Sequence, residues 1–238
     1  MRLLGKVAIV TGSSSGIGKA IALRFGEEGA SVIIAARRDR LCEEVAGQIR
    51  RRGGEAVAIA TDIMEEQQVE QVVTETVQRF GRLDILVNNA GIGGGGRIDE
   101  TSTSDFDRVI ATNLRGTFLC SRAGFRAMRK TGGGTIINIG SVCGVDAWAG
   151  TGAYSASKYG IMGLTKALAD EGRDLGIKAS VICPGGVADE LVDATPQAIE
   201  QSGKINPFDI AETAIFLATL GPNSVVHQIV VDRLGADW

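Results

Sequence analysis

Residues 6–18, KVAIVTGSSSGIG, are the stretch of this 238-residue chain that decides its fold. The apolar, β-branched run at residues 6–11 predicts a buried strand, and the pattern at residues 19–28 predicts a helix. Between them, Gly12, Gly16 and Gly18 permit a tight turn at the start of that helix. Free backbone N–H groups and the helix dipole favour a phosphate there. The spacing G-x-x-x-G-x-G is not the more common G-x-G-x-x-G, but its place between strand and helix favours a dinucleotide.

Strand-like and helical segments alternate along the rest of the chain. Further strands are predicted at residues 31–36, 55–60, 83–87, 134–140, 177–183 and 225–231, and helices at residues 39–52, 65–80, 104–128, 151–175 and 207–220. This order predicts a single α/β domain over residues 1–238, a Rossmann-type, doubly wound, seven-stranded parallel sheet with helices on both faces. Residues 187–206 are polar and weakly patterned, and we expect a substrate loop there.

Composition argues against several classes of protein. A net charge of −3 and an aromatic content of 5% disfavour a nucleic-acid partner. No apolar run approaches the roughly 18 residues of a transmembrane helix, so no membrane partner is expected. The four cysteines are scattered without metal-like spacing, so no metal site is expected. We expect a reduced, cytoplasmic protein.

Two arginines follow the second predicted strand, where an NAD site usually carries an acidic residue. Arg37 and Arg38 suit the 2′-phosphate of NADP(H), which we expect to be preferred over NAD(H), although Asp39 is adjacent and the arginines could be solvated charges. Ligands in open α/β sheets lie outside the carboxyl ends of the strands. Asp62 and residues 88–91 should therefore border one crevice, unless they only make turns.

Tyr154 and Lys158 are four residues apart on a predicted helix, so their side chains share one face. A cation held beside a phenol favours the phenolate and lowers its pKa, although this spacing also occurs in ordinary surface pairs. The single histidine, His227, is near the C-terminus. Because histidine is the usual acid–base group at neutral pH, a catalyst built on this chain needs another group, and Tyr154 is the candidate.

Five motifs occur in one order along the chain: Thr11-Gly12-x-x-x-Gly16-Ile17-Gly18, Asn88-Asn89-Ala90-Gly91, Asn113, Ser141 with Tyr154-x-x-x-Lys158, and Pro184-Gly185. Together they resemble the short-chain dehydrogenase/reductase family over essentially the full chain. The resemblance implies an NADP(H)-dependent oxidoreductase that transfers hydride between the nicotinamide and a small-molecule carbonyl or alcohol. It also implies a homotetramer or homodimer. An NAD-dependent alcohol dehydrogenase of the same fold and a non-catalytic NADP-binding sensor or scaffold are the alternatives.

The resemblance also implies a role for each site residue. Tyr154 is the general acid or base, Ser141 hydrogen-bonds the substrate oxygen, and Lys158 lowers the phenol's pKa and bonds the nicotinamide ribose. Asn113 supports a water-linked proton relay to Lys158. The other implied cofactor-binding residues are Gly12, Ser14, Ser15, Gly16, Ile17 and Gly18 for the pyrophosphate side, Arg37 and Arg38 for the 2′-phosphate, Asp62 and Ile63 for adenine, Asn89, Ala90 and Gly91 for the adenosine ribose, and Pro184, Gly185 and Val187 for nicotinamide.

Two positions depart from the family pattern. Asp189 stands where the family usually carries a threonine that bonds the carboxamide or the phosphates. Because a carboxylate near a phosphate is unfavourable, we expect Asp189 to point away from the site or the loop to be rearranged. Residues 231–235, VDRLG, replace the usual Asp-Gly-Gly near the subunit interface, which concerns the oligomeric contact and not the chemistry.

Overall fold

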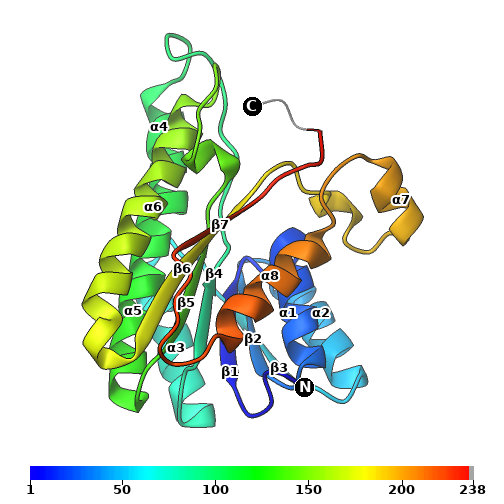
Figure 1. Cartoon of the computed structure of the whole chain (residues 1–238), viewed down its shortest axis with the longest axis vertical. Coiled ribbons are helices and arrows are strands. Elements are labelled where there is room, and N and C mark those ends of the chain that lie inside the picture. The colour runs from blue at the N-terminus through cyan, green and yellow to red at the C-terminus, as the bar shows by residue number, and fades with distance from the viewer. Residues whose placement is uncertain (236–238) are drawn as a thin grey trace.

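The computed structural model describes residues 1–235, apart from the side chain of Leu191, and contains a seven-stranded parallel sheet (Figure 1). Its strands are β1 (Val7–Thr11), β2 (Ser31–Ala36), β3 (Glu55–Ala60), β4 (Ile85–Asn88), β5 (Gly134–Ile139), β6 (Ile177–Pro184) and β7 (Gln228–Val231). They lie in the order β3-β2-β1-β4-β5-β6-β7, and every neighbouring pair is parallel. The order changes direction between β1 and β4, where such sheets form their ligand crevice. The predicted doubly wound α/β fold is confirmed.

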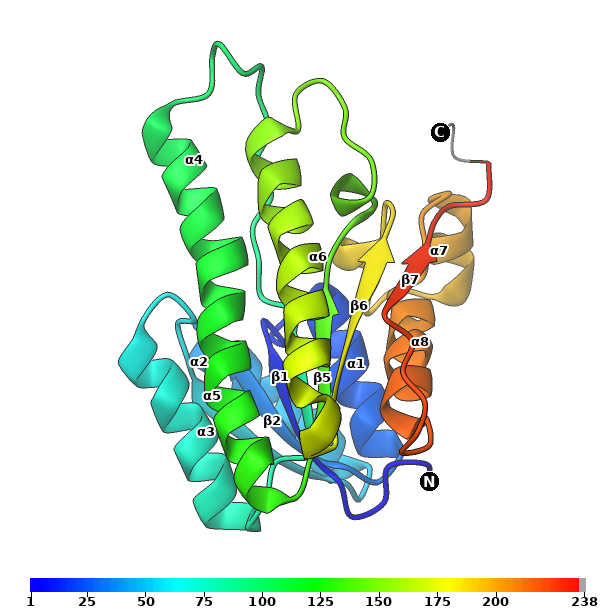
Figure 2. The same ribbon diagram turned by 60° about the vertical axis from the view of Figure 1, so that its left-hand side comes forward.

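Helices cover both faces of the sheet (Figure 2). One face carries α1 (Gly16–Glu27), α2 (Asp39–Arg51) and α8 (Pro207–Thr219), and the other carries α3 (Glu66–Phe80), α5 (Gly116–Thr131) and α6 (Gly152–Gly172). α4 (Thr103–Ile110) continues α5 beyond the end of the sheet, beside α6. α7 (Pro196–Gln201) projects beside α8 (Figure 1).

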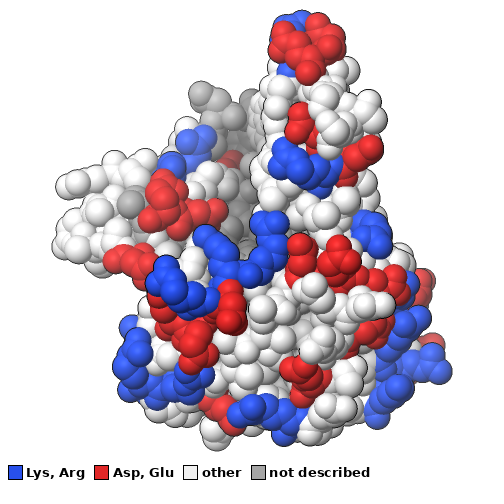
Figure 3. Space-filling model, turned by 180° about the vertical axis from the view of Figure 1, so that it is seen from behind, with Lys and Arg blue, Asp and Glu red and all other residues white. Residues whose placement is uncertain are grey.

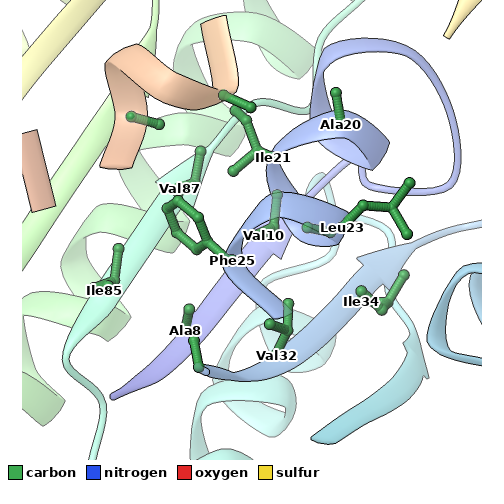
Figure 4. Close-up of a cluster of buried hydrophobic side chains, with 14 of the residues drawn as sticks. Ala8, Val10, Ala20, Ile21, Leu23, Phe25, Val32, Ile34, Ile85 and Val87 are labelled. Atoms are coloured by element: carbon green, nitrogen blue, oxygen red, sulfur yellow. The ribbon is translucent and has the colours of Figure 1, made fainter. Parts of the chain in front are cut away.

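The core forms two apolar layers, one on each side of the sheet. Ala8 and Val10 of β1 face α1 (Figure 4). Ile9, between them, packs with the helices of the opposite face. Strands buried on both faces need continuous apolar sequence, which is why residues 6–11 are recognisable as a strand. Phe25 of α1 is fully buried in the same layer as Ala8 and Val10. Burying a side chain of that size contributes about 1.5–3 kcal/mol.

The helix expected at residues 104–128 differs in detail. It is interrupted by a π-helical turn at Ala111–Arg115, which separates α4 from α5. π-turns are rare and occur mostly at functional sites. This one turns Asn113 inward, where its side chain bonds the backbone of Ile92. Apolar periodicity continues across the turn, so the sequence pattern predicts a single helix.

Further differences from the predicted bounds lie toward the C-terminus. The helix expected at residues 151–175 ends as α6 followed by the 3₁₀ turn Arg173–Leu175, and the last strand starts at Gln228. The segment 187–206 contains a 3₁₀ turn, Asp189–Leu191, and α7. Thr195 caps α7 by accepting the Ala198 N–H, and Pro196 occupies its first turn. In the part of the chain described, no helix combines the length and the apolar character needed to cross a membrane.

Candidate active site

A cleft of about 570 Å³ opens at the carboxyl ends of the strands. In Figure 3 the surface is hollowed between the lobe that carries α7 and the column of α4, α5 and α6, and basic side chains gather at the lower edge of the hollow. The predicted site residues that line the cleft are Gly12, Ser14, Ser15, Gly16, Ile17, Arg37, Arg38, Asp62, Ile63, Asn89, Ala90, Gly91, Ser141, Tyr154, Lys158, Pro184, Gly185 and Val187. Gly18 and Asn113 are the predicted site residues outside this lining.

The glycine turn is fixed by close packing against the end of β4. Gly12 has φ +65°, and a Cβ atom there would lie 2.7 Å from the Cα atom of Ala90. A side chain at Gly18 would collide with the Asn89 amide and the Gly12 carbonyl. Gly18 therefore supports the turn from behind the cleft, although it does not line it. Each position needs glycine because backbone approaches backbone there.

Thr11, which was not among the predicted site residues, joins the ends of β1 and β4. Its hydroxyl oxygen accepts the N–H groups of Asn89 at 3.0 Å and Ala90 at 3.1 Å. The Asn89 amide in turn donates to the Thr11 carbonyl at 3.0 Å. These bonds hold residues 89–91 along the crevice. A hydroxyl directly before Gly12, at a strand end, was the available sequence signal.

Arg38 bends over the glycine turn, whereas Arg37 does not. The Arg38 guanidinium donates to the Ser14 hydroxyl at 2.8 Å and the Ser15 hydroxyl at 2.7 Å. Arg37 is exposed and makes no hydrogen bond or ion pair within residues 1–235. The two serines thus place a cation beside the site expected for phosphate, and Arg37 remains available beside it.

Ser141, Tyr154 and Lys158 meet at the floor of the cleft. Ser141 follows β5, and its hydroxyl accepts the Cys143 N–H at 3.1 Å, which caps a short 3₁₀ turn. Lys158 is buried and donates from Nζ to the Ile139 carbonyl at 2.9 Å. That Nζ lies 5.5 Å from the centroid of the Tyr154 ring. α6 therefore presents the phenol and the ammonium on one face, as their spacing predicts.

The phenol's pKa departs from expectation. Burial raises the pKa of Tyr154 above its ordinary value, and this outweighs the lowering effect of a hydrogen bond with Ser141. Burial also lowers the pKa of Lys158 to about 8. Lys158 is not among the groups that shift the phenol's pKa, so the expected net lowering is not found in this arrangement. Desolvation of the ring dominates, and the ammonium is committed to the Ile139 carbonyl.

Asn113 lies behind the cleft and is 1% exposed. Its side-chain oxygen accepts the Ile92 N–H at 2.8 Å, and its amide nitrogen donates to the Ile92 carbonyl at 2.9 Å and to the Ser157 hydroxyl at 3.1 Å. The side chain thus positions the segment that follows β4 and binds the helix that carries Tyr154. The water-linked relay to Lys158 stays a prediction.

We expected Asp189 to point away from the site or the loop to be rearranged, and the first of these alternatives is wrong. The Asp189 Oδ1 atom accepts the backbone N–H of Ile17 at 3.1 Å, at the N-terminus of α1. A Cβ atom on Gly16 would lie 2.9 Å from the same oxygen. The carboxylate therefore sits over the glycine turn. Other than the departure from a threonine, nothing in the sequence signalled this contact.

The residues present fit a dinucleotide in two respects. The cleft volume falls within the range of about 300–1,000 Å³ that is usual for ligand pockets. The glycine turn exposes backbone to the cleft at a helix N-terminus, which suits a pyrophosphate. Asp189 is the exception, because its charge opposes that of a phosphate. Across residues 1–235, no cluster of three His, Cys, Asp or Glu side chains could hold a metal ion.

Comparison with known proteins agrees with this geometry. Residues 6–200 match the family model described as short chain dehydrogenase. An uncharacterized oxidoreductase of Thermotoga maritima is 44% identical over 83% of this chain and 78% of that protein. A 3-oxoacyl-(acyl-carrier-protein) reductase of Synechocystis sp. is 37% identical over 91% and 90%. A metagenomic short-chain oxidoreductase solved in complex with NADP is 36% identical, with a TM-score of 0.85 over 98% of this chain and 99% of that one. The chain belongs to the short-chain dehydrogenase family of oxidoreductases.

Proposed function

We propose that this enzyme is an NADP(H)-dependent oxidoreductase that transfers hydride between the nicotinamide and a carbonyl or alcohol substrate, with Tyr154 as general acid and base. The observation that carries the proposal is the meeting of Ser141, Tyr154 and Lys158 in the same cleft as the glycine turn. The NADP complex of a similar structure and the reductase name of a relative support it.

The cofactor, when bound, supplies or accepts the hydride. The chain's own residues donate or accept the one proton that the reaction exchanges with the substrate oxygen. With its raised pKa, the Tyr154 phenol is protonated at neutral pH and can donate to a carbonyl oxygen as negative charge develops there. The Ser141 hydroxyl can stabilise the same oxygen. Lys158, with a pKa of about 8, is mostly protonated at neutral pH, and its charge favours the phenolate that remains.

The cofactor preference rests on the two arginines. Arg38, oriented by Ser14 and Ser15, would bond the 2′-phosphate, with Arg37 beside it. A guanidinium presents a planar fork of donors that matches phosphate geometry. Among the cleft-lining residues, 36–38 read Ala-Arg-Arg and supply no carboxylate for a free ribose hydroxyl.

We also propose that the enzyme is cytoplasmic and forms a homodimer or homotetramer. Phe106, Phe118 and Tyr159 lie on α4, α5 and α6 and are each more than 40% exposed. An interface over these helices would cover the three exposed aromatic side chains. Analytical ultracentrifugation tests this, and a monomer at micromolar concentration contradicts it.

The test of function compares the chain's two tyrosines. NADPH consumption is measured against a panel of ketones and aldehydes for the wild type, Tyr154→Phe and Tyr159→Phe. Tyr154→Phe should lose about 10²–10⁴ in kcat while the Kd for NADPH stays unchanged. Tyr159 is exposed and donates to the Val145 carbonyl, so Tyr159→Phe is the matched control. Loss of NADPH binding with Tyr154→Phe, or unchanged turnover, contradicts the assignment.

A further inference from the structure

Residues 189–204, here called the strap, form a loop that leaves the end of the sheet and returns to the same point. Its ends meet at a parallel bridge between Val187 and Ile205. The Ala188 N–H donates to the Ile205 carbonyl, and the Ile205 N–H donates to the Gly186 carbonyl, each at 2.9 Å. Val192 of the strap is buried in the apolar layer against which Ile17 of α1 packs. The strap is therefore packed onto the start of α1.

Two carboxylates fasten the strap to α1. Asp189 accepts the Ile17 N–H at 3.1 Å. Asp193 binds the Lys19 ammonium through both of its oxygens, at 2.6 and 2.8 Å. The Lys19 side chain is only 9% exposed, so its ammonium needs a nearby negative charge, which Asp193 supplies. Both contacts lie within the first turn of α1, at residues 17 and 19.

The Ile17 N–H is also a hydrogen-bond donor that a bound pyrophosphate would use. The first N–H groups of a helix have no partner within the helix, and these are the donors that bind phosphate after a glycine turn. One N–H cannot serve a carboxylate and a phosphate together, and two anions held over Gly16 repel each other. The Asp189 carboxylate and a dinucleotide therefore exclude one another at this position.

We propose that Asp189 sets the cofactor affinity of this enzyme by competing with the pyrophosphate for the Ile17 N–H, so that binding of a dinucleotide requires the strap to leave α1. The inference rests on the proposed dinucleotide site but not on the preference for NADP(H), because NADH and NADPH share the pyrophosphate. Asp189 would thus oppose cofactor binding, whereas the other residues of the site favour it.

Release of Asp189 also changes the surroundings of Tyr154. Burial is the main reason that the pKa of Tyr154 is raised, and the negative charge of Asp189 raises it further. Moving that carboxylate away removes a charge that disfavours the phenolate.

The first experiment measures Kd values for NADPH and NADH with the full-length enzyme. Asp189→Ala removes the competitor, and both Kd values should fall by about tenfold, the scale of one charge-assisted hydrogen bond. Asp189→Asn keeps the shape without the charge, and its Kd values should fall by a smaller factor. Glu200→Gln is the matched control, since Glu200 is an exposed carboxylate of the strap that does not line the cleft. Its Kd values should stay within about twofold of the wild type.

A second measurement tests the contact between Asp189 and the Ile17 N–H directly, and it requires neither turnover nor bound cofactor. Amide hydrogen exchange at Ile17 should be slow in the wild type and in Glu200→Gln, and faster in Asp189→Ala. Unchanged exchange at Ile17 overturns the proposal, as do Kd values for Asp189→Ala that are equal to or higher than those of the wild type. If NADH and NADPH bind equally well but both tighten in Asp189→Ala, only the NADP preference fails. If they tighten without any turnover, only the proposed reaction fails.

Discussion

Lys158 donates from Nζ to the carbonyl oxygen of Ile139 at 2.9 Å, so the last residue of β5 holds the ammonium of α6 at the floor of the cleft. This contact gives a buried lysine one fixed partner. It also directs the cation toward the strand that Ser141 follows. The position of the charge is therefore set by the sheet and not by the tyrosine beside it.

Replacing Lys158 should remove a pH dependence of stability. Burial lowers its pKa from 10.5 to about 8, so between these values the unfolded chain binds more protons than the folded one. Folding stability contributed by this group therefore rises with pH across the window, by up to about 3 kcal/mol. Denaturant unfolding at both ends of the window should show the rise in the wild type and its loss in Lys158→Met. Lys166→Met, exposed on the same helix, is the control. Parallel pH curves for the wild type and Lys158→Met contradict the burial effect.

The two arginines should discriminate between cofactors. Arg38→Ala should raise the Kd for NADPH by about tenfold, the scale of a charge-assisted hydrogen bond. The Kd for NADH should change by less than about twofold, and Arg37→Ala should show the same pattern more weakly. Arg40→Ala is the control, because that side chain is exposed and pairs with Glu44. Equal losses for NADH and NADPH would mean that the arginines act on the fold of the turn instead.

Ser141 should affect turnover more than binding. Ser141→Ala removes one donor to the substrate oxygen, so kcat should fall by about 10²–10³ while the Kd for NADPH is retained. The hydroxyl also accepts the Cys143 N–H, so its loss should cost about 1 kcal/mol of stability as well. Thermal unfolding separates the two effects. A fall in kcat no larger than the loss of folded enzyme argues against a role in chemistry.

Two glycines should respond in opposite directions to alanine. Gly12 has φ +65°, and an added Cβ atom would lie 2.7 Å from the Ala90 Cα atom, so Gly12→Ala should lower Tm and weaken the binding of both cofactors. Gly163 lies inside α6 with no atom within 4 Å of a Cβ position. Gly163→Ala should therefore raise stability by about 0.5–1 kcal/mol. Similar effects of the two substitutions would show that the turn is not tightly packed.

The sheet was predictable because its central strands are buried on both faces. Residues 32–36 are continuously apolar, and residues 134–139 are interrupted by the buried Thr135 and Asn138, so both segments approach the apolar pattern that parallel strands in this fold need. The carboxyl ends of these strands meet at one edge by topology, so residues such as Asn89 and Ser141 could be assigned to one crevice before any contact was known.

Features that depend on distant contacts were not predictable. The π-turn around Asn113 accompanies hydrogen bonds between the Asn113 amide and the backbone of Ile92, 21 residues away. Asp189 reaches Ile17 across 172 residues, through a segment whose polar sequence resembles a loop. The raised pKa of Tyr154 follows from its burial and not from the spacing to Lys158. In each case tertiary environment overrides a local pattern.

Because Val187 and Ile205 form a bridge, the register of the sheet does not depend on the length of the strap between them. Because both ends are anchored at one point, insertions or deletions between them leave β6 and β7 in place. Lengthening a loop with fixed ends adds only a fraction of a kcal/mol per doubling. This position is therefore a graft point, where one segment of chain could be exchanged for another without redesigning the scaffold.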